Sequence, residues 1–245
     1  MTRRPSIAAL ERPDNLPAVI VHGGSQAHRY RDVLDALDTA LDAGADGFEF
    51  DVRQTADGVL VVHHDDAIAE DVLSRMTYAD AARAAAASGY SLPRLDDVLA
   101  RCRGALRLDV ELKDTGFEGA VVDLLHSTGH GSAQYVVTSF DQRALAAVHR
   151  THPEVITGFL AYDVTGPEAL EQFRRSGASF LGPDYQILDD DTLRLAASAG
   201  VALVPWTVND ASALDRLMRA SAVAGIITDR PRDALRIRRV PGTNT

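Results

Sequence analysis

The feature that most constrains the fold is an alternation of short apolar runs with segments of helical periodicity. From residue 104 onward, the apolar runs lie at 105–112, 135–140, 155–160, 178–182, 201–206 and 223–228. The segments between them carry apolar residues three or four positions apart, which is the spacing of one helix face. Strands that alternate with helices predict βαβ units and a parallel sheet.

Two further runs near the N-terminus, 18–22 and 47–53, bring the expected number of parallel strands to eight. Between them, an apolar stripe from Val33 to Leu41 indicates a helix that ends near Gly44. Eight parallel strands with crossover helices close a TIM barrel. We therefore expect an α/β fold of this type, formed by a single domain over residues 1–245.

The apolar run at 59–64 does not fit the parallel set, because only three residues separate it from the preceding strand. A parallel crossover needs about a dozen residues, whereas an Asp-Gly pair between apolar runs is a hairpin signal. A two-residue turn at Asp57-Gly58 predicts that His64 lies opposite Asp51 and shares its face. His63 is then expected to point to the other side.

The stretch at about 65–104 has no place in the barrel strands. Its middle, 78–88, is rich in alanine and predicts a helix, and a second helix is expected over 95–101. We expect this stretch to form a small insert or lid over one side of the barrel mouth.

Composition and charge exclude several classes of protein. The 245 residues are 46% hydrophobic and 24% charged, and the net charge of −10 makes nucleic acid and anionic membranes poor partners. Cys102 is the single cysteine, which excludes an internal disulfide and a multi-cysteine zinc site. No apolar run approaches the ~18 residues of a membrane span, and no signal peptide is evident. We therefore expect a cytoplasmic protein.

Polar residues gather at the expected carboxyl ends of the strands, where TIM barrels build their active sites. In chain order they are His22, Glu49, Asp51, Glu111, Lys113 and Trp206. Residues two apart on a strand share a face, so three carboxylates converge and repel one another. A hard divalent cation, Mg²⁺ or Ca²⁺, would relieve that repulsion. The alternative is that Glu49 and Asp51 lie at the rim in ion pairs with arginines.

The histidines and the one lysine suggest a type of chemistry. His22 and His64 suit acid–base catalysis because imidazole titrates near neutrality. Lys113 is the only lysine among 25 basic residues, and its compact charge would attract an anionic substrate. Together with a metal, these groups favour phosphoryl transfer. Histidines away from strand ends are expected to be structural; they are His28, His126, His130, His149 and His152.

Several motifs make the chain resemble the glycerophosphodiester phosphodiesterases. They are VHGG at 21–24, GADGFEFDVRQTADGVLVVHHDD at 44–66, LPRLDDVL at 92–99, LDVELKD at 108–114, SF at 139–140, VPWTVND at 204–210 and GIITDRP at 225–231. The resemblance implies a TIM barrel with an insert and a small phosphodiester substrate. It also implies residue roles: Glu49, Asp51 and Glu111 as metal ligands, His22 and His64 as the acid–base pair, Lys113 as a phosphate ligand and Trp206 as part of the substrate wall.

The chain departs from the family pattern at three positions, and its insert is shorter. Gly23 stands where the family has an arginine that helps to hold the phosphate. Residues 30–33 replace the family's Pro-Glu-Asn-Thr motif, and Gly182 replaces an asparagine. The candidates for the missing phosphate contact are Arg31, Arg53 and Arg94.

The main hypothesis is a metal-dependent phosphodiesterase that cleaves a glycerophosphodiester to an alcohol and a glycerol phosphate. An alternative keeps the barrel and the metal but acts as a lysophospholipase D or sphingomyelinase D. A third possibility is a non-catalytic barrel that binds a phosphate ester or a metal. An unrelated TIM-barrel aldolase or isomerase is disfavoured, because carboxylates around Lys113 would keep its amine charged.

Overall fold

The computed structural model describes residues 7, 10, 12, 14, 16–23, 33–102, 104–162 and 166–239. Of the departure at residues 30–33, residues 30–32 lie outside the described residues, as do the candidates His28 and Arg31.

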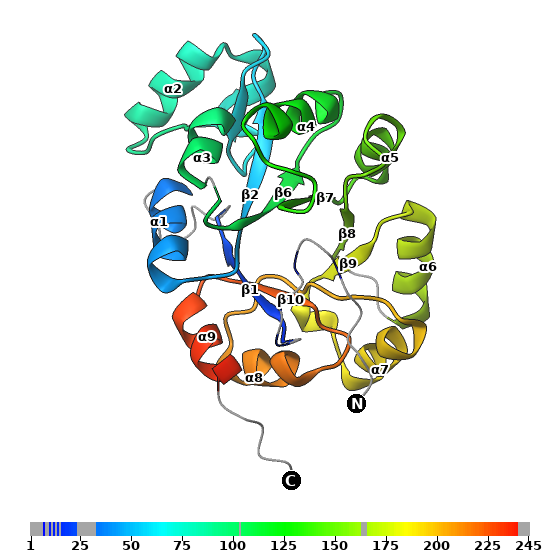
Figure 1. The fold of residues 1–245 in the computed structure, drawn as a ribbon. Helices are drawn as coiled ribbons and strands as arrows, with labels where there is room; N and C mark the ends of the chain where they lie inside the picture. The colour runs from blue at the N-terminus through cyan, green and yellow to red at the C-terminus, as the bar shows by residue number, and fades with distance from the viewer. Residues whose placement is uncertain are drawn as a thin grey trace.

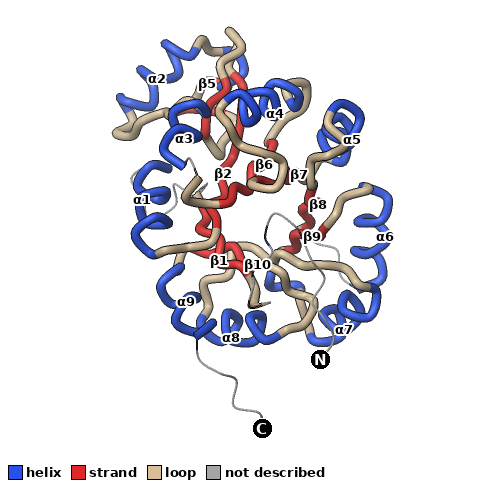
Figure 2. The backbone as a smooth tube through the Cα atoms, in the orientation of Figure 1, coloured by secondary structure: helices blue, strands red, loops and turns tan. Residues whose placement is uncertain are grey.

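Within the described residues, seven strands form one curled sheet in the order β10-β1-β2-β6-β7-β8-β9. Their bounds are β1 (Ala18–His22), β2 (Gly47–Gln54), β6 (Arg107–Leu112), β7 (Tyr135–Ser139), β8 (Thr157–Ala161), β9 (Phe180–Pro183) and β10 (Gly225–Thr228). Every neighbouring pair in this order is parallel. Figures 1 and 2 show these strands as a ring surrounded by helices.

Residues 202–206 close the ring between β9 and β10 through backbone hydrogen bonds to both strands. The N–H of Leu181 donates to the carbonyl of Ala202 at 3.0 Å, and the N–H of Ile227 donates to the carbonyl of Pro205 at 3.0 Å. Parallel bridges also join Leu203 to Leu181 in β9 and to Val223, which lies just before β10. All eight expected parallel segments are therefore found among the described residues, and the TIM-barrel prediction is confirmed.

Helices pack around the outside of the barrel. They are α1 (Val33–Ala43), α3 (Leu95–Cys102), α4 (Glu118–Ser127), α5 (Gln142–Thr151), α6 (Gly166–Ser176), α7 (Asp190–Ala199), α8 (Ala211–Arg219) and α9 (Pro231–Arg239), with a short 3-10 helix η3 (Tyr185–Ile187). Asp141 and Asp210 each accept a hydrogen bond from a backbone N–H of the helix that follows, as N-caps do. Among the described residues, no helix has the length and apolar character needed to cross a membrane.

Strand β2 continues into a hairpin with β3 (Leu60–Val62), which pairs with it antiparallel. The turn contains three residues, 56–58, rather than the two expected. The N–H of Thr55 donates to the carbonyl of Val59 at 3.0 Å, and Gly58 has a φ of +83°. A glycine in the left-handed region is typical of a three-residue hairpin turn.

The longer turn moves the pairing of the two strands by one residue. The N–H of His63, not that of His64, donates to the carbonyl of Asp51 at 3.0 Å, so the predicted pairing of His64 with Asp51 is wrong. Because β3 ends at Val62, the chain leaves the ladder at this point. The ring of His63 then stacks on Tyr90, and His64 reaches the barrel mouth.

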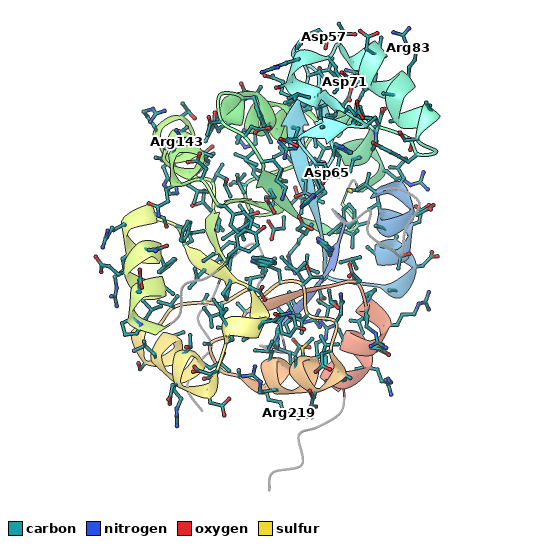
Figure 3. All side chains as sticks on the ribbon, turned by 180° about the vertical axis from the view of Figure 1, so that it is seen from behind. Asp57, Asp65, Asp71, Arg83, Arg143 and Arg219 are labelled. Carbon is teal, nitrogen blue, oxygen red and sulfur yellow. The ribbon has the colours of Figure 1, made fainter. Side chains whose placement is uncertain are left out.

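An excursion follows β3 and contains β4 (Ala67–Ile68), β5 (Asp71–Val72), a 3-10 helix η2 (Leu73–Arg75) and α2 (Tyr78–Ala87). It has a small apolar core of its own and lies beside the ring, outside α3 and α4 (Figure 1). Figure 3 shows Asp71 and Arg83 at its outer end, together with Asp57 of the hairpin turn, and Asp65 nearer to the barrel.

Helix α3 differs from this excursion in its packing. Its buried side chains Leu95, Val98 and Leu99 belong to the main core. The helix expected at 95–101 therefore serves as the crossover between β2 and β6.

Candidate active site

One pocket of about 520 Å³ opens at the carboxyl ends of the strands. Its lining residues are His22, Glu49, Asp51, His64, Asp65, Glu111, Lys113, Thr138, Phe140, Leu160, Tyr162, Trp206, Thr207 and Ile227. All seven site residues expected from the sequence are among them. A pocket of this size accommodates a small ligand with several polar groups.

Three buried carboxylates form the floor of the pocket. Glu49 and Asp51 come from β2, and Glu111 on β6 pairs directly with Asp51 across the sheet. One oxygen from each lies within 4.8 Å of the others. Burial, reinforced by the neighbouring carboxylates, raises the pKa of Glu49 well above its usual value and that of Glu111 to about 8.

These carboxylates fit a divalent cation. Oδ2 of Asp51 is buried and has no hydrogen-bond partner among the described residues. A buried, unpaired carboxylate oxygen is costly, and an oxygen-binding cation would satisfy it. Glu49, Asp51 and Glu111 are therefore suited to hold such an ion.

Lys113 lies between two of the carboxylates. Its Nζ is 2.9 Å from Oδ1 of Asp51 and 2.5 Å from Oε1 of Glu111. Burial lowers the pKa of Lys113, but the two carboxylates outweigh that effect and raise it. When all three carboxylates ionise, one ammonium leaves an excess negative charge that a divalent cation would offset. No arginine pairs with Glu49 or Asp51 in the described part of the chain, unlike the alternative considered above.

Asp109 lies one layer deeper in the barrel, level with Glu49 on the neighbouring strand. Its Oδ1 accepts a hydrogen bond from the hydroxyl of Thr138 at 2.7 Å, and burial raises its pKa to about 7. The sequence places Asp109 on the same strand face as Glu111. This shared face was the sequence signal for a fourth acidic group at the site, although from the sequence we gave Asp109 no role.

His22 is held by residues at the ends of the last two barrel strands. Its Nδ1 lies 2.9 Å from Oδ1 of Asp229, and its Nε2 lies 3.9 Å from Oε2 of Glu49. The side-chain amide of Asn209 donates to Oδ2 of Asp229 at 2.6 Å. From the sequence we did not identify Asn209 or Asp229, although each follows a strand and lies within one of the motifs at 204–210 and 225–231.

His64 enters the pocket from the chain that follows β3. Its Nδ1 lies 2.8 Å from Oδ1 of Asp65, and its side chain is 47% exposed. Arg53 donates from Nε to the carbonyl of His64 at 3.0 Å and from Nη1 to Asp114 at 2.6 Å. Of the arginines considered for the missing phosphate contact, the structure describes two. Arg53 lies beside the site, whereas Arg94 lines a separate smaller pocket.

Three aromatic rings form the wall facing the carboxylates. Phe140 and Tyr162 stack at 4.4 Å, and Trp206 lies nearly perpendicular to both, at 5.5 and 5.1 Å. The indole N–H of Trp206 donates to the carbonyl of Gly182 at 2.8 Å, which fixes the ring. Trp206 therefore belongs to a larger aromatic wall than the sequence indicated.

Close packing explains the departure at Gly23. A Cβ atom there would lie 2.4 Å from the carbonyl oxygen of Glu49 and 2.5 Å from the ring of Phe48. This backbone therefore has no room for an arginine at 23. A Cβ atom at Gly182 would lie 2.5 Å from a terminal methyl of Leu160, so an asparagine there requires only that this side chain moves.

A TIM barrel with carboxylates, a lysine and two histidines at its carboxyl mouth is suited to an enzyme that acts on phosphate esters. Residues 22–233 match the model of the glycerophosphoryl diester phosphodiesterase family. The chain belongs to this family, so the predicted resemblance and the prediction of a phosphodiesterase are confirmed.

Individual relatives agree with this assignment. The chain is 27% identical over 252 residues to a glycerophosphodiester phosphodiesterase of Bacillus subtilis (strain 168), covering 89% of this chain and 85% of that protein. It matches the crystal structure of a glycerophosphodiester phosphodiesterase from Parabacteroides distasonis ATCC 8503 at a TM-score of 0.76 and 26% identity, covering 90% and 96% of the chains. An Oleispira antarctica phosphodiesterase, solved in complex with the product sn-glycerol-3-phosphate, shares the fold at a TM-score of 0.79 and 21% identity, covering 91% and 97%.

Proposed function

We propose that this chain is a metal-dependent enzyme that hydrolyses glycerophosphodiesters to an alcohol and a glycerol phosphate. The observation that carries the proposal is the convergence of Glu49, Asp51 and Glu111 beside two histidines in one pocket. Carboxylates alone would suit many metal enzymes, and histidines alone would suit many acid–base catalysts. Their combination, in a member of this family, favours a phosphodiester substrate.

In this proposal, Glu49, Asp51 and Glu111 hold Mg²⁺ or Ca²⁺, the cations that prefer oxygen ligands. When bound, such a cation polarises phosphoryl oxygens and offsets the negative charge that develops during the reaction. The ammonium of Lys113 remains charged, and it attracts the phosphate to the same end of the pocket.

The two histidines would share the proton transfers. Asp229 engages Nδ1 of His22, which leaves Nε2 for proton exchange with a bound substrate. One histidine takes a proton from the attacking oxygen, which belongs to water or to a neighbouring glycerol hydroxyl. The other gives a proton to the departing alcohol oxygen. His22 and His64 fit either role.

The aromatic wall favours one alternative substrate class. Phe140, Tyr162 and Trp206 would shelter an apolar leaving group, as in a lysophospholipase D or sphingomyelinase D reaction, and Tyr162 is 54% exposed. Turnover of glycerophosphocholine and of lysophosphatidylcholine separates the two candidates. Faster turnover of the lysophospholipid would favour the alternative.

The decisive experiment is hydrolysis by metal-stripped protein after separate addition of Mg²⁺, Ca²⁺ or Mn²⁺. We expect one cation to restore turnover and Glu49→Ala to abolish it. Glu171→Ala, at an exposed ion pair on α6, is the matched control and should retain turnover. Folded protein that binds a cation but turns over no diester would instead support a non-catalytic binding role.

From the sequence we further propose that residues 1–245 form a single domain, that the protein is cytoplasmic and that it has no nucleic-acid partner. The net charge of −10 supports the last of these.

A further inference from the structure

A second group of metal-binding side chains lies on the barrel exterior, away from the pocket. His126 is in the last turn of α4, His152 is the C-cap of α5, and Glu154 follows two residues later. In a barrel of this type, crossover helices run back along the strands, so their C-terminal ends lie at the end opposite the active site. One ligand atom from each of the three residues lies within 4.8 Å of the others.

We propose that His126, His152 and Glu154 bind a divalent transition-metal ion, with Zn²⁺ as the preferred ion. Two imidazoles and one carboxylate form a donor set that suits zinc, whereas Mg²⁺ and Ca²⁺ prefer oxygen alone. The pocket, with its three carboxylates, has the opposite preference. The two sites therefore differ in chemistry as well as in position.

The spacing of the side chains is that of ligands around an ion. Nδ1 of His152 lies 3.7 Å from Oε1 of Glu154. This separation exceeds the range of about 2.7–3.2 Å for direct hydrogen bonds. Zinc bonds of about 2.0–2.2 Å place two ligands of one ion roughly 3.3–3.8 Å apart. A zinc ion would thus bridge these groups after only small side-chain movements.

The ring of His126 is already oriented by the protein. The hydroxyl of Tyr135, a buried residue at the start of β7, lies 3.0 Å from Nε2 of His126. Ligand histidines commonly make such a hydrogen bond at the nitrogen that does not bind the metal. Because Tyr135 occupies Nε2, Nδ1 of His126 is the nitrogen that would bind the ion.

Bound zinc would join the end of α4 to the turn between α5 and β8. These segments are separate in sequence, so the ion would act as a cross-link and stabilise the folded state. His126 and His152 would then have a binding role beyond the structural one expected from the sequence.

The test is calorimetric titration of metal-stripped protein with Zn²⁺, together with thermal unfolding. We expect His152→Ala and Glu154→Gln to bind one zinc equivalent fewer than the wild type, and to lose the rise in Tm that this ion causes. His149→Ala, also on α5 but hydrogen-bonded to Thr157, and Glu171→Gln on α6 are the matched controls and should keep both. Unchanged zinc stoichiometry in both His152→Ala and Glu154→Gln would overturn the proposal.

A second comparison separates this site from the pocket. Glu111→Gln should lose any zinc that binds among the pocket carboxylates and keep the equivalent that depends on His152. Conversely, His152→Ala should keep the phosphodiester turnover of the wild type in Mg²⁺ or Ca²⁺. Loss of the His152-dependent equivalent in Glu111→Gln would assign that zinc to the pocket and contradict the proposal.

Discussion

Nδ1 of His22 lies 2.9 Å from Oδ1 of Asp229, although the two residues are 207 positions apart in the sequence. Strands β1 and β10 are neighbours in the ring, which brings the start of the barrel to its end. The carboxylate of Asp229 is itself held by the amide of Asn209. The position of His22 therefore depends on the closure of the barrel.

Asp229→Asn tests this relationship. The amide keeps the shape of the side chain but removes the charge that stabilises a protonated imidazole. We expect kcat to fall by about 10- to 100-fold with a smaller change in KM. Asp215→Asn removes a carboxylate from a surface ion pair on α8 and should have no effect. Wild-type kcat in Asp229→Asn would show that the contact does not position the catalytic group.

The two adjacent histidines after β3 should behave differently. His64 lines the pocket, whereas His63 is buried and its ring stacks on Tyr90 at 5.9 Å. We expect His64→Ala, like His22→Ala, to lose about 100-fold or more in turnover while remaining folded. His63→Ala should lower the unfolding midpoint and retain turnover in the folded fraction. The opposite pattern would show that His63, and not His64, has the acid–base role.

Restoring the family arginine at position 23 should harm the protein. In Gly23→Arg, even the first side-chain carbon collides with the backbone of Glu49, a proposed metal ligand. We expect a lower Tm and lower turnover, because overpacking of this kind costs about 1–3 kcal/mol or more. Gly119→Arg is the control, since no atom lies within 4 Å of an added Cβ there. Higher turnover in Gly23→Arg would mean that the strand end yields and that the arginine binds phosphate.

The pKa of Asp109 predicts a pH dependence of stability in the metal-free protein. Burial raises this pKa from 3.8 to about 7, so the folded state keeps a proton that the unfolded chain releases. The free energy of unfolding is therefore highest below about pH 4. It falls by roughly 1–4 kcal/mol as the pH rises toward 7. Glu111, with a pKa of about 8, extends the loss to higher pH.

Urea unfolding of metal-free protein at pH 5 and pH 8 measures this loss. Asp109→Asn should remove the part between about pH 4 and 7, because the amide carries no proton to release. Asp42→Asn, at an exposed position on α1, should leave the pH dependence unchanged. A wild-type pH dependence in Asp109→Asn would show that other groups hold the proton.

The sequence by itself determined the eight barrel strands, most of their helices and the strand-end residues that line the pocket. These features follow from local patterns, because the spacing of apolar residues reports which face of each element is buried. The carboxyl ends of parallel strands meet at one mouth, so the sequence alone predicts that Glu49, Asp51 and Glu111 lie together.

Only the tertiary structure decided how those elements meet. One additional turn residue changed the pairing of β2 with β3. A shift of the pairing by one residue exchanges the two faces of a strand. His64 still reaches the pocket because β3 ends at Val62. The contact of His22 with Asp229, the wall around Trp206 and the steric need for Gly23 all join segments far apart in the sequence. Such contacts depend on distances across the closed barrel, which the spacing of residues along the chain does not contain.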